Sequence, residues 1–519
     1  MSQPTNDASS TNPSRTPRPL PTAGAGRKEW TAFVVLLLPL LLVSMDVSVL
    51  FFAIPSITRE LDPSSTQQLW IFDIYAFALA GLLITMGSLG DRIGRRKLLL
   101  FGAAAFGVAS IGAAYAQSAE MLIAARALLG VGGATLMPST MALIRNMFTD
   151  TKQRSKAVGI WSGAMAGGIA LGSVMSGIML EHFWWGSVFL INVPAMVLLL
   201  ALVPLLVPEF KDPEPGRFDL LSVPLSMGSV LPVIYGVKET AAHGISVAML
   251  LCVLAGLAVG TVFVRRQGSG RSTMISRALF QERGFGAGIT LNALAAFAMM
   301  GSSYFTTQYL QSVLGMSTVE AALWSLAPSV SVGIAAPAAT AVAQRVRRSS
   351  VVAAGFVIAA AGFVVLNLTG TDSLWLLLAG AAISSCGIVT VMALVADMAL
   401  ASAPVEKAGS AASLLETGQE FGGAMGMALL GSIGMAVYRA DIPASAPHQV
   451  RETLGGARAA GGPGMVDLAR EAFVHGMHFA AAGGAALLLA GAVLTVVLLR
   501  GRKNPVGREA AGASAELAA

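Results

Sequence analysis

The stretch GSLGDRIGRRK, residues 87–97, joins two long apolar runs and combines glycines, one acid and several basic residues. Gly87 and Gly94 permit close helix approach and a tight turn. Asp91 can accept hydrogen bonds near a helix end, and guanidinium groups can clamp it across the loop. The guanidinium groups belong to Arg92, Arg95 and Arg96. A basic anchor at a membrane surface would explain these arginines but not the spacing of the glycines and the aspartate.

The composition around this stretch indicates a membrane protein. Of 519 residues, 55% are hydrophobic and only 12% are charged, about half the charge of an average soluble protein. The net charge of +6 comes from short basic clusters between apolar runs, without the continuous basic face that nucleic-acid binding needs. Cys252 and Cys386 both lie in apolar runs, so we expect no disulfide framework and no metal site.

Apolar runs long enough to cross a bilayer, about 20 residues each, occur fourteen times. The chain is therefore predicted to be an all-α membrane protein with fourteen transmembrane helices. The expected spans are 31–55, 68–89, 98–116, 121–144, 155–180, 185–207, 219–238, 244–264, 284–311, 318–343, 350–369, 374–397, 408–437 and 473–499.

Lys and Arg gather in alternate connections between these spans, and cytoplasmic connections retain such residues. The pattern places both termini in the cytoplasm and predicts a multi-pass protein of the cytoplasmic membrane. A polar, Pro-containing linker separates the first six helices from the rest. The expected organisation is a disordered cytoplasmic tail (1–30), a six-helix half (31–207), a cytoplasmic linker (208–218), two additional helices (219–264), a second six-helix half (265–500) with an external loop (438–472), and a cytoplasmic tail (501–519).

The G-x-L-x-D-R-x-G-R-R-K run at 87–97 resembles the loop between the second and third helices of the major facilitator superfamily. In that family the loop latches one conformation of the transporter. The resemblance therefore implies two six-helix halves plus two extra helices, and a conformational role for the loop. The implied latch residues are Gly87, Asp91, Arg92, Gly94, Arg95 and Arg96.

Four further blocks resemble the fourteen-helix drug/proton antiporters of that superfamily, in particular its quaternary-ammonium and multidrug efflux type. One block departs from the family pattern: GSVMSG at 172–177 has Ser173 where the antiporter motif carries proline and Ser176 where it carries glycine. The four matching blocks are MDVSVLFFAIPSI (45–57), RALLGVGGA (126–134), EHFWWGSVFLINVP (181–194) and VEKAGSAASLLETGQEFGGAMG (405–426).

Acids within the apolar runs are the candidate proton and substrate sites, because a charge inside a membrane needs a cavity, a partner or a proton. Glu416 and Glu420 are four residues apart and share one helix face. Gly418, Gly422 and Gly426 fall on the opposite face, where they can pack against another helix. Leu415 replaces the first acid of the pair that the resembled subgroup carries at this place.

Asp46, Asp73 and Arg126 complete the set, and each has a second interpretation. Asp46 either exchanges protons or pairs with a polar neighbour such as Ser48. Asp73 either faces substrate, as the resemblance implies, or lies at the outer water boundary. Arg126 either forms a structural salt bridge or, as the resemblance implies, couples proton movement to the cavity carboxylates.

The predicted function is proton-coupled efflux of lipophilic, cationic drugs such as quaternary ammonium compounds, dyes and antibiotics. No phosphate-binding G-x-x-x-x-G-K-[ST] loop and no catalytic constellation is present, so we expect neither ATP nor another cofactor, and no enzymatic activity. The expected partners are a small-molecule drug, protons and the lipid bilayer, and the expected state is a monomer. A dedicated exporter of one endogenous natural product would share every motif.

Overall fold

In a computed structural model, the described residues are 26–148, 150–211, 221–244, 246–268, 283–402, 408–460 and 462–499. Within these ranges the chain forms helices and their connections, without a strand. The expected tail 501–519 and most of the linker 208–218 lie outside the described residues. The expected tail 1–30 also lies largely outside them, and its last residues already belong to the first helix.

The first group of helices contains seven elements. α2 packs against α4, α3 packs against α4 and α7, and α1 packs against α5. A bend of 52° divides α2 into Ser65–Leu83 and Thr85–Ile93. The elements are α1 (Arg27–Leu61), α2 (Ser65–Ile93), α3 (Arg95–Ala114), α4 (Ala119–Met147), α5 (Thr151–His182), α6 (Ser187–Leu190) and α7 (Asn192–Leu206).

The second group packs around α14 and α15. α13 contacts α14 and α18, and α11 contacts α14 and α15. The elements are α11 (Arg283–Gln308), the π-helix η1 (Tyr309–Val313), α12 (Thr318–Arg345), α13 (Arg348–Leu366), α14 (Leu374–Ala401), α15 (Ala408–Asp441), α16 (His448–Glu452), α17 (Leu454–Ala460) and α18 (Pro463–Leu499).

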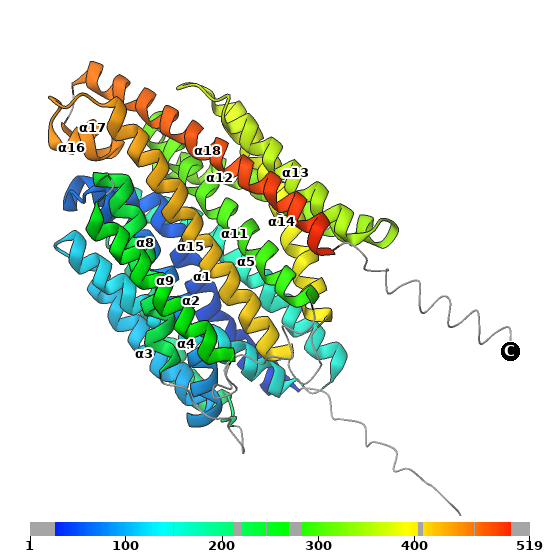
Figure 1. Ribbon diagram of the computed structural model, residues 1–519. Helices are drawn as coiled ribbons and strands as arrows, with labels where there is room; N and C mark the ends of the chain where they lie inside the picture. Colours follow the sequence, from blue (N-terminus) through cyan, green and yellow to red (C-terminus); the bar gives the residue numbers. More distant parts are fainter. Residues whose placement is uncertain are drawn as a thin grey trace, which may run out of the picture.

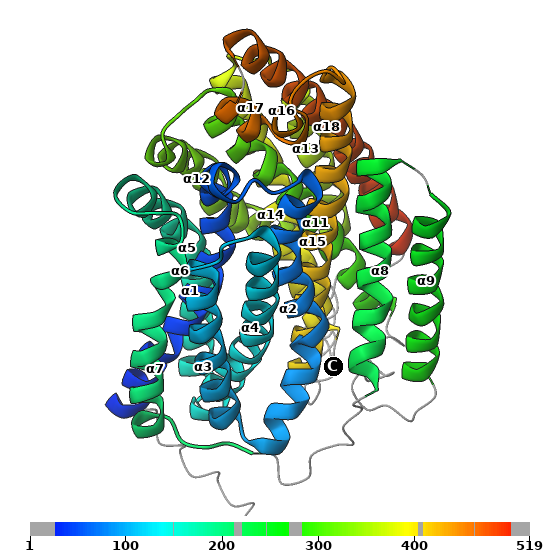
Figure 2. The same cartoon turned by 90° about the vertical axis from the view of Figure 1, so that its left-hand side faces the viewer.

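The two groups meet where α2 packs on α15 and α5 packs on α12. The remaining helices, α8 (Ser222–His243) and α9 (Val247–Gly268), form a tight pair. Of this pair, α8 packs against both α2 and α15. The pair stands beside the bundle with α9 outermost (Figure 2).

The expected number of fourteen spans is not confirmed. Among the described residues, eleven helices are long and apolar enough to cross a membrane, or twelve when the bent α2 is counted as one span. The two expected extra spans contain shorter apolar helices, Ser222–Gly236 and Val247–Phe263. The protein is therefore an all-helical membrane protein with eleven to twelve candidate spans.

Residues 438–472, expected to be a loop, are largely helical. α15 continues to Asp441, α18 begins at Pro463, and α16 and α17 lie between them. We call α16 and α17 the cap, and Figures 1 and 2 place it at one end of the bundle. The Tyr438 hydroxyl donates to the Val450 carbonyl (2.7 Å), which folds the cap onto α15.

The cap also holds the first helix group, through side chains of α16. Glu452 accepts a hydrogen bond from the Ser65 backbone N–H (2.8 Å) and pairs with Arg439. The Gln449 amide donates to the Asp62 carboxylate (2.9 Å). The cap therefore joins the α1–α2 connection to the end of α15.

Candidate functional site

A buried cavity of about 50 Å³ lies where the two helix groups meet. Its walls are mostly apolar and aromatic, with side chains from α1, α2, α4, α11 and α15. Two acids, Asp73 of α2 and Glu420 of α15, line the cavity from the two groups. Its other lining residues are Val47, Phe51, Phe72, Tyr75, Ala76, Arg126, Ala296, Met299, Met300, Gln419, Gly423, Ala424 and Met427.

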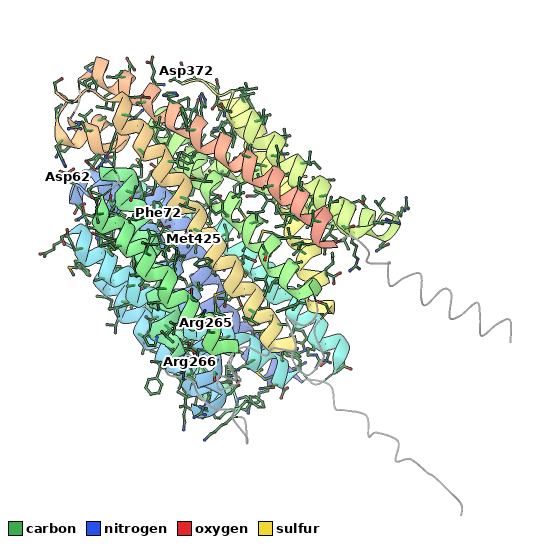
Figure 3. All side chains as sticks on the ribbon, in the orientation of Figure 1. Asp62, Phe72, Arg265, Arg266, Asp372 and Met425 are labelled. Atoms are coloured by element: carbon green, nitrogen blue, oxygen red, sulfur yellow. The ribbon has the colours of Figure 1, made fainter. Side chains whose placement is uncertain are left out.

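Asp73 lies in the protein interior and not at a water boundary. The residue is 1% exposed and lines the cavity. The adjacent Phe72, labelled in Figure 3, also lines the cavity and stacks near Phe51 with ring centroids 5.1 Å apart. This burial contradicts the interpretation in which Asp73 lies at the outer water boundary.

Asp46 is paired with Arg126 and not with Ser48. The Arg126 guanidinium donates to the Asp46 carboxylate, and both side chains are 2% exposed. The Ser48 hydroxyl instead donates to the carbonyl of Met45 (3.0 Å). Asp46 is not among the residues that line the cavity, whereas its partner Arg126 is.

Arg126 binds three helices together. Besides Asp46 of α1, its Nε donates to the Ile71 carbonyl of α2 (3.1 Å). Its guanidinium carbon lies 4.5 Å from the ring centroid of Tyr75, a distance at which a cation is attracted to an aromatic face. The salt bridge and the cavity position coexist, so the geometry accommodates both interpretations of Arg126.

Glu416 and Glu420 occupy different positions on α15. Glu420 lines the cavity, while Glu416 is half-buried one turn away and is not among the lining residues. The opposite face of the helix is packed: an added Cβ at Gly422 or Gly426 would overlap the backbone carbonyl of Ala293 or Phe297 of α11. Glycine therefore allows α15 to lie directly on α11, and this fixes the face that carries Glu420.

The latch residues are only partly arranged as the sequence predicted. Arg95 holds Asp91 with an ion pair of 2.5 Å, and Gly94 has a φ of +112°, which favours glycine. Packing does not require glycine at position 87, because an added Cβ would lie 3.9 Å from Pro138, an ordinary van der Waals contact. Arg92 is half-buried on the same turn.

Arg96 does not clamp Asp91 but faces Glu209, which the sequence reasoning missed. The Glu209 carboxylate accepts hydrogen bonds from the backbone N–H groups of Arg96 (2.9 Å) and Lys97 (3.2 Å). It thereby caps α3 at the end where its backbone N–H groups and dipole attract anions. Glu209 falls in the polar run that reads as a linker, and nothing in that pattern shows the contact.

The glycines of α5 differ in how closely they are packed. An added Cβ at Gly168 or Gly172 would overlap Ser44 or Ser48 of α1, whereas Gly163 and Gly167 have open space around them. In the divergent 172–177 motif, Ser173 and Ser176 donate hydrogen bonds to backbone carbonyls of the same helix (3.1 and 2.9 Å). Both hydroxyls are therefore satisfied within the helix, and α5 runs through the divergent motif without the proline of the family pattern.

Pro55 and two glutamines lie between the cavity and the cap. Pro55 of α1 lacks the N–H that would bond the Phe51 carbonyl four residues earlier, and the Gln308 amide donates to that carbonyl instead (3.2 Å). The Gln311 amide donates to the neighbouring Phe52 carbonyl (3.2 Å). The two helix groups are therefore hydrogen-bonded to each other between the cavity and the cap.

Two comparisons of sequence give consistent results. The family model described as Major Facilitator Superfamily matches residues 36–427. The chain is 42% identical over 487 residues to "Multidrug efflux pump LfrA" of Mycolicibacterium smegmatis, covering 91% of this chain and 97% of that protein. It is 32% identical over 492 residues to "Methyl viologen resistance protein SmvA" of Salmonella typhimurium, covering 89% of this chain and 97% of that protein.

The fold is also shared with solved transporter structures. A bacterial homologue of the human lysosomal transporter Spinster, in an inward-facing and unoccupied conformation, superposes with a TM-score of 0.68 at 17% identity, covering 93% of this chain and 100% of that one. This similarity concerns the fold alone. The loop at 87–97, the two helix groups and the family match together show that this multi-pass membrane protein belongs to the Major Facilitator Superfamily, whose members are transporters and not enzymes.

Proposed function

We propose that this protein exports lipophilic, cationic drugs across the cell membrane in exchange for protons. The observation that carries the proposal is the placement of Asp73 and Glu420 on walls contributed by different helix groups around one buried cavity. The names of the two relatives, a multidrug efflux pump and a methyl viologen resistance protein, support drug efflux.

The cavity chemistry fits a flat, hydrophobic cation. Phe51, Phe72 and Tyr75 offer aromatic faces, and Met299 and Met300 offer adaptable apolar contacts. A carboxylate among such groups is costly unless it binds a proton or a cation. Protonation therefore competes with drug binding, and this competition couples the two flows.

The observed cavity is too small for a drug. Sites for drug-sized ligands enclose about 300–1,000 Å³, whereas this cavity has about 50 Å³. Drug binding therefore requires the two helix groups to separate. The loop at 87–97, with its Arg95–Asp91 pair, is our proposed latch for that motion.

We further propose that the protein works as a monomer with both termini in the cytoplasm. The distribution of Lys and Arg along the sequence supports this orientation. Cysteines introduced at Asp372 and Asp91 distinguish the two orientations. In intact cells an impermeant thiol reagent should label a cysteine at Asp372 and leave one at Asp91 unlabelled; the reverse would overturn the assignment.

The central test is dye transport in inverted membrane vesicles with an imposed pH gradient. We expect Glu420→Gln and Asp73→Asn to be inserted normally but to lose pH-driven transport of a fluorescent cation. Glu320→Gln is the matched control, because Glu320 is an exposed acid in a helix-capping box with Ser317 (3.0 and 3.2 Å). Full transport by both cavity variants would refute the proposal, and activity on a single natural product alone would indicate a dedicated exporter.

A further inference from the structure

A second hollow of about 650 Å³ lies on the flank of the bundle, between α8, α9 and α15. It is separate from the central cavity, and α15 forms the wall between them. We call this second hollow the flank groove. Phe421 and Met425 of α15 line the flank groove, whereas Glu420 and Ala424 of the same helix line the central cavity. A ligand in the flank groove would therefore touch the helix that carries the candidate transport acid.

The walls of the flank groove are apolar over most of their length. Val233 of α8, Leu257 of α9 and Met425 of α15 are representative, and Leu257 is 56% exposed. The neighbouring Leu250 and Leu254 of α9 are also more than half exposed, as expected for a helix face in contact with lipid. The groove therefore opens toward the hydrocarbon region of a membrane.

Among the described residues, Arg265 is the one charged residue that lines the groove, and its positive charge determines which ligand fits. Arg265, in the last turn of α9, is exposed and borders the hollow. No Asp or Glu is among the described lining residues. In Figure 3 Arg265 and Arg266 lie toward the end of the bundle opposite Asp62 and Asp372. Basic residues at a helix end meet the headgroup layer of a bilayer.

We propose that the flank groove binds one anionic phospholipid, with its phosphate on Arg265 and an acyl chain along Val233, Leu257 and Met425. The guanidinium would repel a lipophilic cation but pairs with phosphate through charge-assisted hydrogen bonds. An acyl chain fills an apolar hollow of this size, and clusters of basic residues at the membrane surface attract anionic lipids. On the proposed orientation the lipid comes from the cytoplasmic leaflet.

Such a lipid would fasten α8 and α9 to the transport bundle. α8 lies over the line where α2 meets α15, packed through Phe77, Ile234 and Ala424. The lipid would contact α9 and α15 together and reinforce that arrangement. This inference does not depend on the nature of the exported substrate.

The test is lipid retention by the purified full-length protein, measured by native mass spectrometry. Phosphatidylglycerol and phosphatidylcholine with identical chains are compared. We expect phosphatidylglycerol to be retained selectively, and Arg265→Gln to bind it about fivefold more weakly. Arg345→Gln is the matched control, since Arg345 is an exposed arginine in the last turn of α12 that does not line the groove.

A second variant tests the acyl-chain site. Thr261 lines the groove and is exposed, so Thr261→Trp should fill the hollow without disturbing packing and should also reduce retention. Equal retention of the two lipids, or unchanged phosphatidylglycerol binding in both Arg265→Gln and Thr261→Trp, would overturn the proposal. Binding of tetraphenylphosphonium that is lost in Thr261→Trp would overturn it too, because the groove would then hold a cation.

Discussion

Arg126 of α4 and Asp46 of α1 form an ion pair in the protein interior, with each side chain 2% exposed. Arg126 lines the candidate cavity, and Asp46 lies behind it as its partner without lining the cavity itself. Two charges withdrawn from water depend on each other: removing one leaves the other uncompensated. Asp46 is therefore expected to differ from Asp73 and Glu420 in how it responds to substitution.

Neutralising Asp46 should destabilise the protein. We expect Asp46→Asn to lower the free energy of unfolding by about 3–5 kcal/mol, the cost of an unpaired buried charge, seen as a lower Tm in detergent. The double variant Asp46→Asn/Arg126→Gln removes both charges and should recover much of that loss. If efflux returns along with stability, the pair is structural, whereas efflux that stays absent in a stable double variant shows a coupling role. An unchanged Tm in Asp46→Asn would contradict the prediction.

Glu416 and Glu420 should give different phenotypes because only Glu420 lines the cavity. Glu420→Gln should weaken binding of a cationic dye about tenfold, through loss of a charge-assisted contact. Glu416→Gln should leave dye affinity near the wild-type value, because Glu416 does not line the cavity. Equilibrium dye binding and vesicle transport measure these effects separately. Identical affinities for both variants would show that the cavity position of Glu420 has no bearing on substrate.

The positive φ of Gly94 makes this position intolerant of a side chain. Gly94→Ala should cost about 1–3 kcal/mol, and the new methyl group would also overlap the Glu209 carboxylate. Gly87→Ala is the control, since its added Cβ finds only an ordinary contact. Thermal unfolding and the rate of efflux should both change in the first variant and not in the second. Equal effects of the two substitutions would argue against the assigned geometry.

The contact between α11 and α15 depends on glycine. Gly422→Ala should force the two helices apart and lower stability by about 1–3 kcal/mol, as overpacking does. Gly483→Ala on α18 has open space for the same methyl group and should be neutral. Thermal unfolding of the two variants provides the comparison. A Gly422→Ala protein as stable as the wild type would mean that the helices do not pack this closely.

The cap should lose stability in acid through Glu452. Burial alone would raise the pKa of this carboxyl group, but the hydrogen bonds from Arg439 and the Ser65 backbone outweigh burial and hold the pKa below its usual value. A lowered pKa in the folded state means that the stabilisation is full above the unfolded pKa of about 4.3 and disappears as the pH falls through the folded value.

We therefore expect Glu452→Gln to lower the stability of the cap by about 1.5–3 kcal/mol at pH 7, the range for hydrogen bonds to charged groups. The difference from the wild type should vanish at low pH. Hydrogen exchange of the cap amides at several pH values measures it. A difference that grows toward acidic pH would show that the sign is wrong.

The sequence was informative where charge and apolar patterns act locally. The apolar runs predicted the helices, the 87–97 motif predicted the family, and the spacing of Gly422 and Gly426 predicted the packed face of α15. These predictions depend only on the period of an α-helix and on the free-energy cost of placing a charge in lipid. The resemblance directed attention to Asp73, whose burial in the cavity wall is compatible with its implied role.

Contacts between distant segments could not be predicted in the same way. The Asp46–Arg126 pair spans 80 residues and the contact from Glu209 to Arg96 spans 113, and no local pattern specifies such partners. The sequence did not predict the helices of the cap, because a Gly- and Ala-rich stretch is typical of a loop. In the structure, hydrogen bonds to Tyr438 and Ser65 hold these helices in place. The α8 and α9 spans were predicted as ordinary crossings although their apolar segments are shorter.

Pro55 has a consequence for the proposed separation of the two helix groups. Its ring deprives the Phe51 carbonyl of an intrahelical donor, and Gln308 supplies one from the other half of the molecule. When the two helix groups separate, the Phe51 carbonyl oxygen loses this donor. It must then accept a hydrogen bond from water, because a buried carbonyl without a partner is unfavourable. Water must therefore reach the Phe51 carbonyl as the two helix groups separate, beside a residue that already lines the central cavity.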